Sequence, residues 1–153
     1  MLGFEQKDMG SAPGLEEVLS IGLPEVGFLD DEHKHILLKM SEVKSANARS
    51  LSKDKLSEEY DELIAVTRQH FSDEEEHMRR MKFPDLEQHQ RIHEQLFVTL
   101  EKYRQELKGS VYGRFPSSVF DFFRTWLVSH IMIVDQKYVR SRNTVCHKAE
   151  ILK

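Results

Sequence analysis

Residues 86–103 read LEQHQRIHEQLFVTLEKY, and the spacing of their apolar and histidine side chains predicts a helix. Leu86, His89, His93 and Leu96 follow one another at intervals of three or four residues, and the pattern continues to the end of the stretch. Because an α-helix has about 3.6 residues per turn, these side chains share one face. The stretch therefore predicts a helix that buries an apolar stripe containing two imidazoles.

The same periodicity predicts three more helices, which are separated by short breakers. The sequence SLSKDK ends the first helix and offers Ser50 or Ser52 as the N-cap of the second. Phe83 and Pro84 end the second helix, and Pro84 suits the first turn of the third. The expected spans of the other helices are about 30–49, 52–81 and 116–140.

Four helices joined by short connections predict an all-α fold, in which neighbouring helices are antiparallel. We expect an up-down-up-down four-helix bundle over residues 30–140. Residues 1–29 do not fit the helical pattern and are expected to form an extended N-terminal arm, while residues 141–153 are expected to form a short C-terminal tail.

Composition excludes several classes of protein. The chain has 153 residues, of which 39% are hydrophobic, so a core can form. Seven glycines and four prolines are too few for the many turns of an all-β fold. A net charge of −4 argues against nucleic-acid binding, and the apolar runs are too short to span a membrane. The single cysteine, Cys146, excludes an internal disulfide and favours a reducing cytoplasm.

Histidine and carboxylate pairs recur at positions that should face the bundle interior. His70 and Glu74 are four residues apart on the second helix, as are His89 and His93 on the third. A spacing of four places both side chains of a pair on one face, one turn apart, where they can reach a common metal centre.

Three further candidates lie at the same end of the predicted bundle. His33 is near the start of the first helix, and His130 and Asp135 are late in the fourth. In an antiparallel bundle these positions come to the same height as the pairs above. His130 and Asp135 are five residues apart, about 140° around an ideal helix. Either the two side chains flank the bundle axis, or a local π-bulge aligns them.

Five imidazoles and two carboxylates are too many ligands for one tetrahedral zinc ion. They suit two five- or six-coordinate ions that share bridging carboxylates and keep one open position. Imidazole with carboxylate is a donor set that suits iron, among other first-row metals. No pair of cysteines is available for a zinc or iron–sulfur site.

These stretches resemble the hemerythrin family, and within it the bacterial single-domain branch (bacteriohemerythrin). The matching segments span about two-thirds of the chain. They are LDDEH (29–33), HFSDEE (70–75), HQRIH (89–93) and WLVSHIMIVDQKY (126–138).

The resemblance implies a cofactor of two iron ions. One would be held by His89, His93 and His130, and the other by His33 and His70. Glu74 and Asp135 would bridge the ions together with an oxo or hydroxo group. Dioxygen would bind at the two-histidine iron. The tryptophan that often precedes the first ligand motif in bacterial members is missing here.

An apolar oxygen pocket is expected within one turn of the ligands, and Tyr138 could hydrogen-bond near a bridging carboxylate. Neutral imidazoles stabilise high-valent iron less well than carboxylates do, so this donor set favours reversible dioxygen binding over cleavage of the O–O bond. The expected pocket residues are Ile36, Phe71, Trp126, Leu127 and Ile131.

Other titratable residues have simpler interpretations. Periodicity alone would make His77 a candidate ligand, but EEEHMRR is typical of a solvated helix end, so a surface position is expected. His35 is likewise expected on the surface. Asp73 and Glu75, which flank the presumed ligand Glu74, are expected to be solvated.

The leading hypothesis is a non-enzymatic protein that binds dioxygen for storage, delivery, transport or sensing. The alternative is a di-iron enzyme acting on peroxide, dioxygen or nitric oxide. A monomer is the default expectation, since no exposed heptad seam demands a partner, and a protein client is left open.

Overall fold

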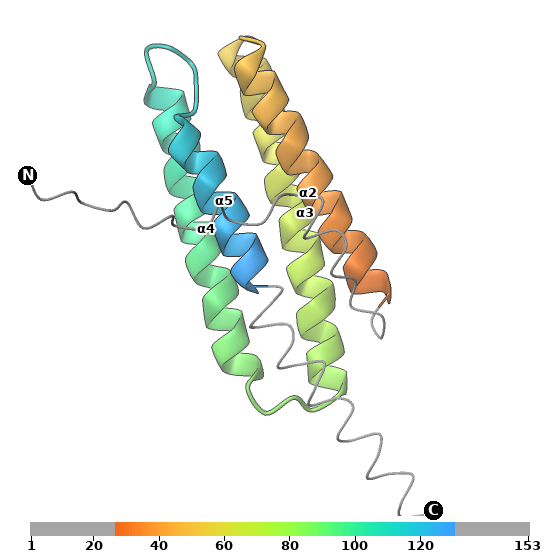
Figure 1. Ribbon diagram of the computed structural model, residues 1–153. Helices are drawn as coiled ribbons and strands as arrows, with labels where there is room; N and C mark the ends of the chain where they lie inside the picture. The colour runs from red at the N-terminus through yellow and green to blue at the C-terminus, as the bar shows by residue number, and fades with distance from the viewer. Residues whose placement is uncertain (1–26, 131–153) are drawn as a thin grey trace, which may run out of the picture.

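The computed structural model describes residues 27–130, which form four α-helices and no strand. Successive helices run in opposite directions, so the α2–α3 and α4–α5 connections lie at one end of the molecule and the α3–α4 connection at the other (Figure 1). The predicted all-α, up-down-up-down bundle is confirmed for this part of the chain. The helices are α2 (Gly27–Ala48), α3 (Lys53–Arg80), α4 (Leu86–Gly109) and α5 (Ser117–Ser129).

Helix α3 begins where the sequence predicts. The hydroxyl oxygen of Ser52 accepts a hydrogen bond from the backbone N–H of Lys55 (3.2 Å), so Ser52 is the N-cap. Helix α4 begins later than expected: its first residue is Leu86 and its N-cap is Asp85. Pro84 therefore lies in the preceding turn and not in the first turn of α4.

Two helices end without glycine. Ser50, after α2, and Lys82, after α3, adopt positive φ angles of 60° and 53°. In both cases the next backbone N–H reaches five residues back, from Leu51 to Ala46 (3.4 Å) and from Phe83 to Met78 (3.0 Å). This is the Schellman pattern, which satisfies the last carbonyl groups of a helix and reverses the chain.

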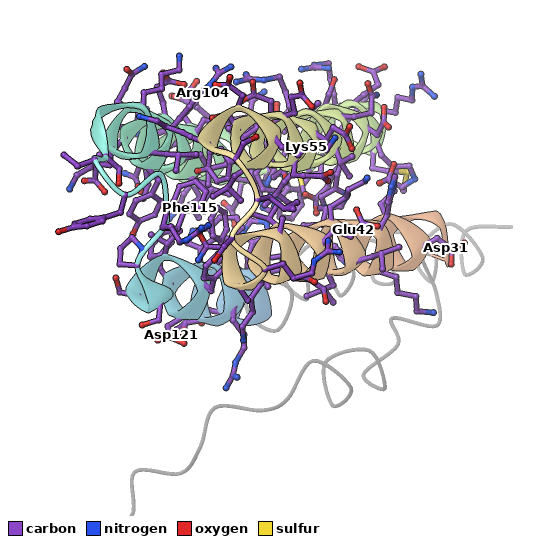
Figure 2. The ribbon with its side chains drawn as sticks, turned by 90° about the horizontal axis from the view of Figure 1, so that it is seen from above. Asp31, Glu42, Lys55, Arg104, Phe115 and Asp121 are labelled. Carbon is purple, nitrogen blue, oxygen red and sulfur yellow. The ribbon has the colours of Figure 1, made fainter. Side chains whose placement is uncertain are left out.

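The four helices form two layers around one core. Seen from above, α3 and α4 form one layer and α2 and α5 the other (Figure 2). Phe115 lies between the layers, while Arg104 and Asp121 lie on the outside. All four helices contribute buried apolar residues, among them Leu37, Val43, Leu56, Leu63, Phe71, Leu96, Leu100, Val119, Phe123 and Leu127.

The connection between α4 and α5 is fastened to the α2–α3 end of the bundle. The side chain of Asn47 both donates to the backbone oxygen of Phe115 (3.0 Å) and accepts from its N–H (2.8 Å). Nζ of Lys53 donates to the backbone oxygens of Lys108 and Ser110, each at 3.0 Å. These bonds fix where α5 starts. They therefore also fix how far along the bundle His130, the residue after α5, lies.

The predicted continuation of the fourth helix to Arg140, the tail and most of the N-terminal arm lie outside the described residues. Helix α2 begins at Gly27, slightly before the predicted Asp30. Within residues 27–130, no helix is long and apolar enough to cross a membrane.

Candidate metal centre

Six of the seven predicted ligands lie within the described residues, and all six are buried. Each exposes 3% or less of its surface. His33 lies early in α2, two of the others late in α3, two early in α4, and His130 directly follows α5. The six are His33, His70, Glu74, His89, His93 and His130. Asp135 lies outside the described residues.

Glu74 lies at the centre of this group. Its Oε2 atom is 3.3 Å from Nε2 of His89 and 3.3 Å from Nε2 of His93. Nε2 of His93 is in turn 3.2 Å from Nε2 of His130. One ligating atom from each of these four residues falls within 4.8 Å of all the others. Three helix ends therefore direct three imidazoles and one carboxylate at a common point.

The other two histidines lie beside this cluster. The rings of His33 and His70 meet edge to face, with centroids 4.6 Å apart. Nε2 of His70 is 4.0 Å from Oε2 of Glu74, and no described residue forms a hydrogen bond with it. Glu74 is thus within reach of both histidine groups, which is the position that a bridging carboxylate would occupy.

Aromatic side chains stack on two of the imidazoles. Phe71 stacks on His93 with centroids 3.6 Å apart and planes at 3°, and Trp126 stacks on His130 at 4.6 Å and 12°. Ile36 and Leu127 are buried, with exposures of 4% and 3%. These four are predicted pocket residues. The fifth, Ile131, and the predicted neighbour Tyr138 lie outside the described residues.

The backbone changes type at the end of α5. His130, which directly follows the regular α-helix, has π-helical character. A π-turn is the local change that would turn a residue five positions later toward the same face. The backbone at His130 is therefore compatible with the second of the two arrangements considered for His130 and Asp135.

Two carboxylates that contact the presumed ligands were missed from the sequence. Glu75 was expected to be solvated; its side chain is partly exposed, but its Oε1 is also 2.7 Å from Nδ1 of His93. Glu32, to which the sequence assigned no role, places Oε2 2.8 Å from Nδ1 of His70. The only sequence signal for either glutamate is that it stands next to a presumed ligand along the chain, at the height of the ligand that it contacts on the neighbouring helix.

The remaining histidines differ in their surroundings. His35 is exposed, as predicted. His77, expected on the surface, is half-buried, and its Nδ1 atom is shielded from solvent. His77 does not belong to the cluster around Glu74.

The donor set fits a first-row metal. A fully buried carboxylate among imidazoles is costly unless its charge is compensated, and a cation would compensate it. Imidazole nitrogen and carboxylate oxygen suit iron, copper, nickel and zinc more than calcium or magnesium, which prefer oxygen alone. The convergence of Nε2 atoms on Glu74 leaves these donors directed inward.

Comparison with known proteins agrees with this chemistry. The model of the Hemerythrin HHE cation binding domain family matches residues 25–140. The myohemerythrin of Sipunculus nudus is 32% identical over 112 residues, which cover 72% of this chain and 79% of that protein. The bacteriohemerythrin of Stenotrophomonas maltophilia (strain R551-3) is 28% identical over 127 residues, covering 80% and 76%. No solved structure gives a significant match.

Proposed function

Because the chain belongs to the hemerythrin family, we propose that it binds dioxygen reversibly at a non-haem di-iron centre and serves oxygen storage, delivery or sensing. The buried carboxylate of Glu74 is the observation that carries the proposal. It lies against Nε2 of His89 and of His93 and within 4.0 Å of Nε2 of His70. A single carboxylate between two groups of imidazoles is the arrangement that two bridged ions require.

The proposed ligand assignment divides the histidines by their place in the bundle. The group on α4 and α5 would hold one ion, and the pair on α2 and α3 the other. Glu74, and Asp135 from beyond the described residues, would bridge the two. When bound, a pair of ferrous ions would supply the two electrons that dioxygen accepts. The proposed ligands are His89, His93 and His130 for one ion, and His33 and His70 for the other.

The protein's own contribution is to orient the donors and to exclude water. Helix ends fix the height of each imidazole, and the stacking of Phe71 on His93 fixes the plane of that ring. Buried Ile36 and Leu127 give the site an apolar boundary. An apolar boundary admits a small neutral molecule such as dioxygen and disfavours bulk water, which slows irreversible oxidation.

The test is to measure iron per chain and then record visible spectra of the reduced protein before adding oxygen, after adding it and after removing it. About two irons per chain with a visible band that appears with oxygen and disappears on its removal would support the proposal. Two irons that oxidise at once, without a stable oxygenated form, would favour the di-iron enzyme acting on peroxide, dioxygen or nitric oxide. A chain that binds no iron would refute both.

A further inference from the structure

Two glutamates stand directly behind the presumed ligands, on the side away from Glu74. Oε2 of Glu32, on α2, lies 2.8 Å from Nδ1 of His70, on α3. Oε1 of Glu75, on α3, lies 2.7 Å from Nδ1 of His93, on α4. In both pairs the other ring nitrogen, Nε2, faces the cluster. Each half of the site therefore contains one imidazole held between an outer carboxylate and the interior.

The chemistry of a carboxylate decides which ring nitrogen carries the proton. An ionised carboxylate can only accept hydrogen bonds, so Nδ1–H of each histidine must donate. A neutral imidazole with its proton on Nδ1 has its lone pair on Nε2. The outer glutamates thus keep a proton on Nδ1 of His70 and His93, which leaves Nε2 as the nitrogen that can bind a metal in the interior.

The two glutamates lie at the edge of the core. The side chains of Glu32 and Glu75 are 28% and 21% exposed, whereas those of His70 and His93 are only 1% and 2% exposed. Partial hydration lowers the cost of a charge that would be large deeper inside. These glutamates are therefore suited to act on buried rings from outside the core.

Both contacts also join different helices. Glu32 joins α2 to α3 through His70, and Glu75 joins α3 to α4 through His93. Glu75 is held further by Gln90, whose Nε2 donates to its second carboxylate oxygen (3.0 Å). The ring of His93 is thus fixed on one side by Glu75 and on one face by stacked Phe71.

We propose that Glu32 and Glu75 are positioning residues, one for each half of the site, which fix the tautomer and direction of His70 and His93 before metal binds. The consequence for iron rests on the proposed function, but the tautomers are a property of the metal-free chain. Loss of such an outer carboxylate typically weakens metal binding roughly 10–100-fold.

The test compares Glu75→Ala and Glu75→Gln with Glu76→Gln, a matched control whose carboxylate bonds only Arg79 and Arg80 among the described residues. Long-range proton–nitrogen NMR of the metal-free protein reports the tautomer of each histidine. Anaerobic titration with ferrous ion against a chelator reports affinity, and circular dichroism confirms folding. Glu32→Ala and Glu32→Gln are compared in the same way with Asp31→Asn, which alters an exposed neighbour.

We expect a proton on Nδ1 of both histidines in the unmodified chain, with or without a second proton on Nε2. Glu75→Ala should leave His93, but not His70, in a mixture of tautomers. It should also weaken ferrous binding roughly 10–100-fold. Glu75→Gln, whose amide oxygen still accepts, should keep the tautomer with a smaller loss. Glu32→Ala should release His70 alone.

Mixed tautomers in the unmodified chain, or unchanged ferrous affinity in both Ala variants, would overturn the proposal. If an Ala variant does not fold, its Gln counterpart decides: affinity equal to that of the matched control overturns the proposal. A fixed tautomer in a chain that takes up no iron would reject the proposed function while supporting the positioning role.

Discussion

The substitution Glu74→Gln should have opposite effects on the metal-free and the iron-loaded protein. Glu74 is fully buried, and its carboxylate lies 3.3 Å from the Nε2 atoms of His89 and His93. Without metal, the fold must either keep this charge away from water or pair it with a protonated imidazole, and both choices cost free energy. Gln has nearly the same shape and no charge.

The size of the effect follows from that burial. Burying one ion without a compensating charge costs several kcal/mol, so removing that charge with a neutral group of similar volume should stabilise the metal-free chain by about 1–4 kcal/mol. For a domain of this size, that corresponds to a rise in the Tm of the metal-free protein of roughly 3–12 °C. In the iron-loaded protein the same change removes the proposed bridging ligand. The loss of ferrous affinity should therefore exceed the roughly 10–100-fold typical of an outer-shell residue.

Thermal melts at pH 8 measure both effects. The Tm with chelator reports the stability of the metal-free protein, and the Tm after iron loading reports the stability that iron adds. Glu76→Gln is the control, because its carboxylate is on the surface and should change neither quantity appreciably. A metal-free Glu74→Gln chain that melts below the unmodified one would refute the reasoning, since it would show that the buried carboxylate stabilises the empty bundle.

Three further outcomes are expected from other parts of the molecule. Leu127→Asn places an amide at a position only 3% exposed, so water should enter the site and the oxygenated form should decay faster than in a Val98→Asn control; an unchanged rate would contradict the pocket. Asn47→Ala removes both hydrogen bonds to the backbone of Phe115 and should lower the free energy of unfolding in urea by about 1–3 kcal/mol, and an unchanged midpoint would show that those bonds are replaced by water. Burial raises the pKa of Tyr60 above its ordinary value of 10.0, so the stability that depends on its protonated form is complete below that value and is lost as pH rises through the raised pKa. Tyr60→Phe should therefore reduce the loss of stability at alkaline pH, which denaturant titrations at successive pH values would measure.

Local pattern predicted the helices because helix formation depends on neighbours three and four residues apart. The stripe through His89, His93 and Leu96 predicted α4, and Ser52, one of the two caps predicted for α3, is its N-cap. Both follow from interactions within one turn. The prediction for Pro84 was wrong because the turn after α3, and not the helical pattern, determines where Asp85 and Leu86 lie. Such a turn depends on how two helices pack, which a single-helix pattern does not contain.

The sequence also determined which end of the bundle holds the histidines. An antiparallel path brings residues early in one helix beside residues late in the next, so chain order alone places His33 beside His70 and His89 beside Glu74. Only the tertiary structure decided what stands behind these rings. Glu75 follows Glu74 along the chain, yet about 100° of helical rotation separates the two side chains. One therefore points into the cluster, and the other reaches Nδ1 of His93 on the next helix. Rotation of one helix against another sets that contact, and it depends on packing across the whole core.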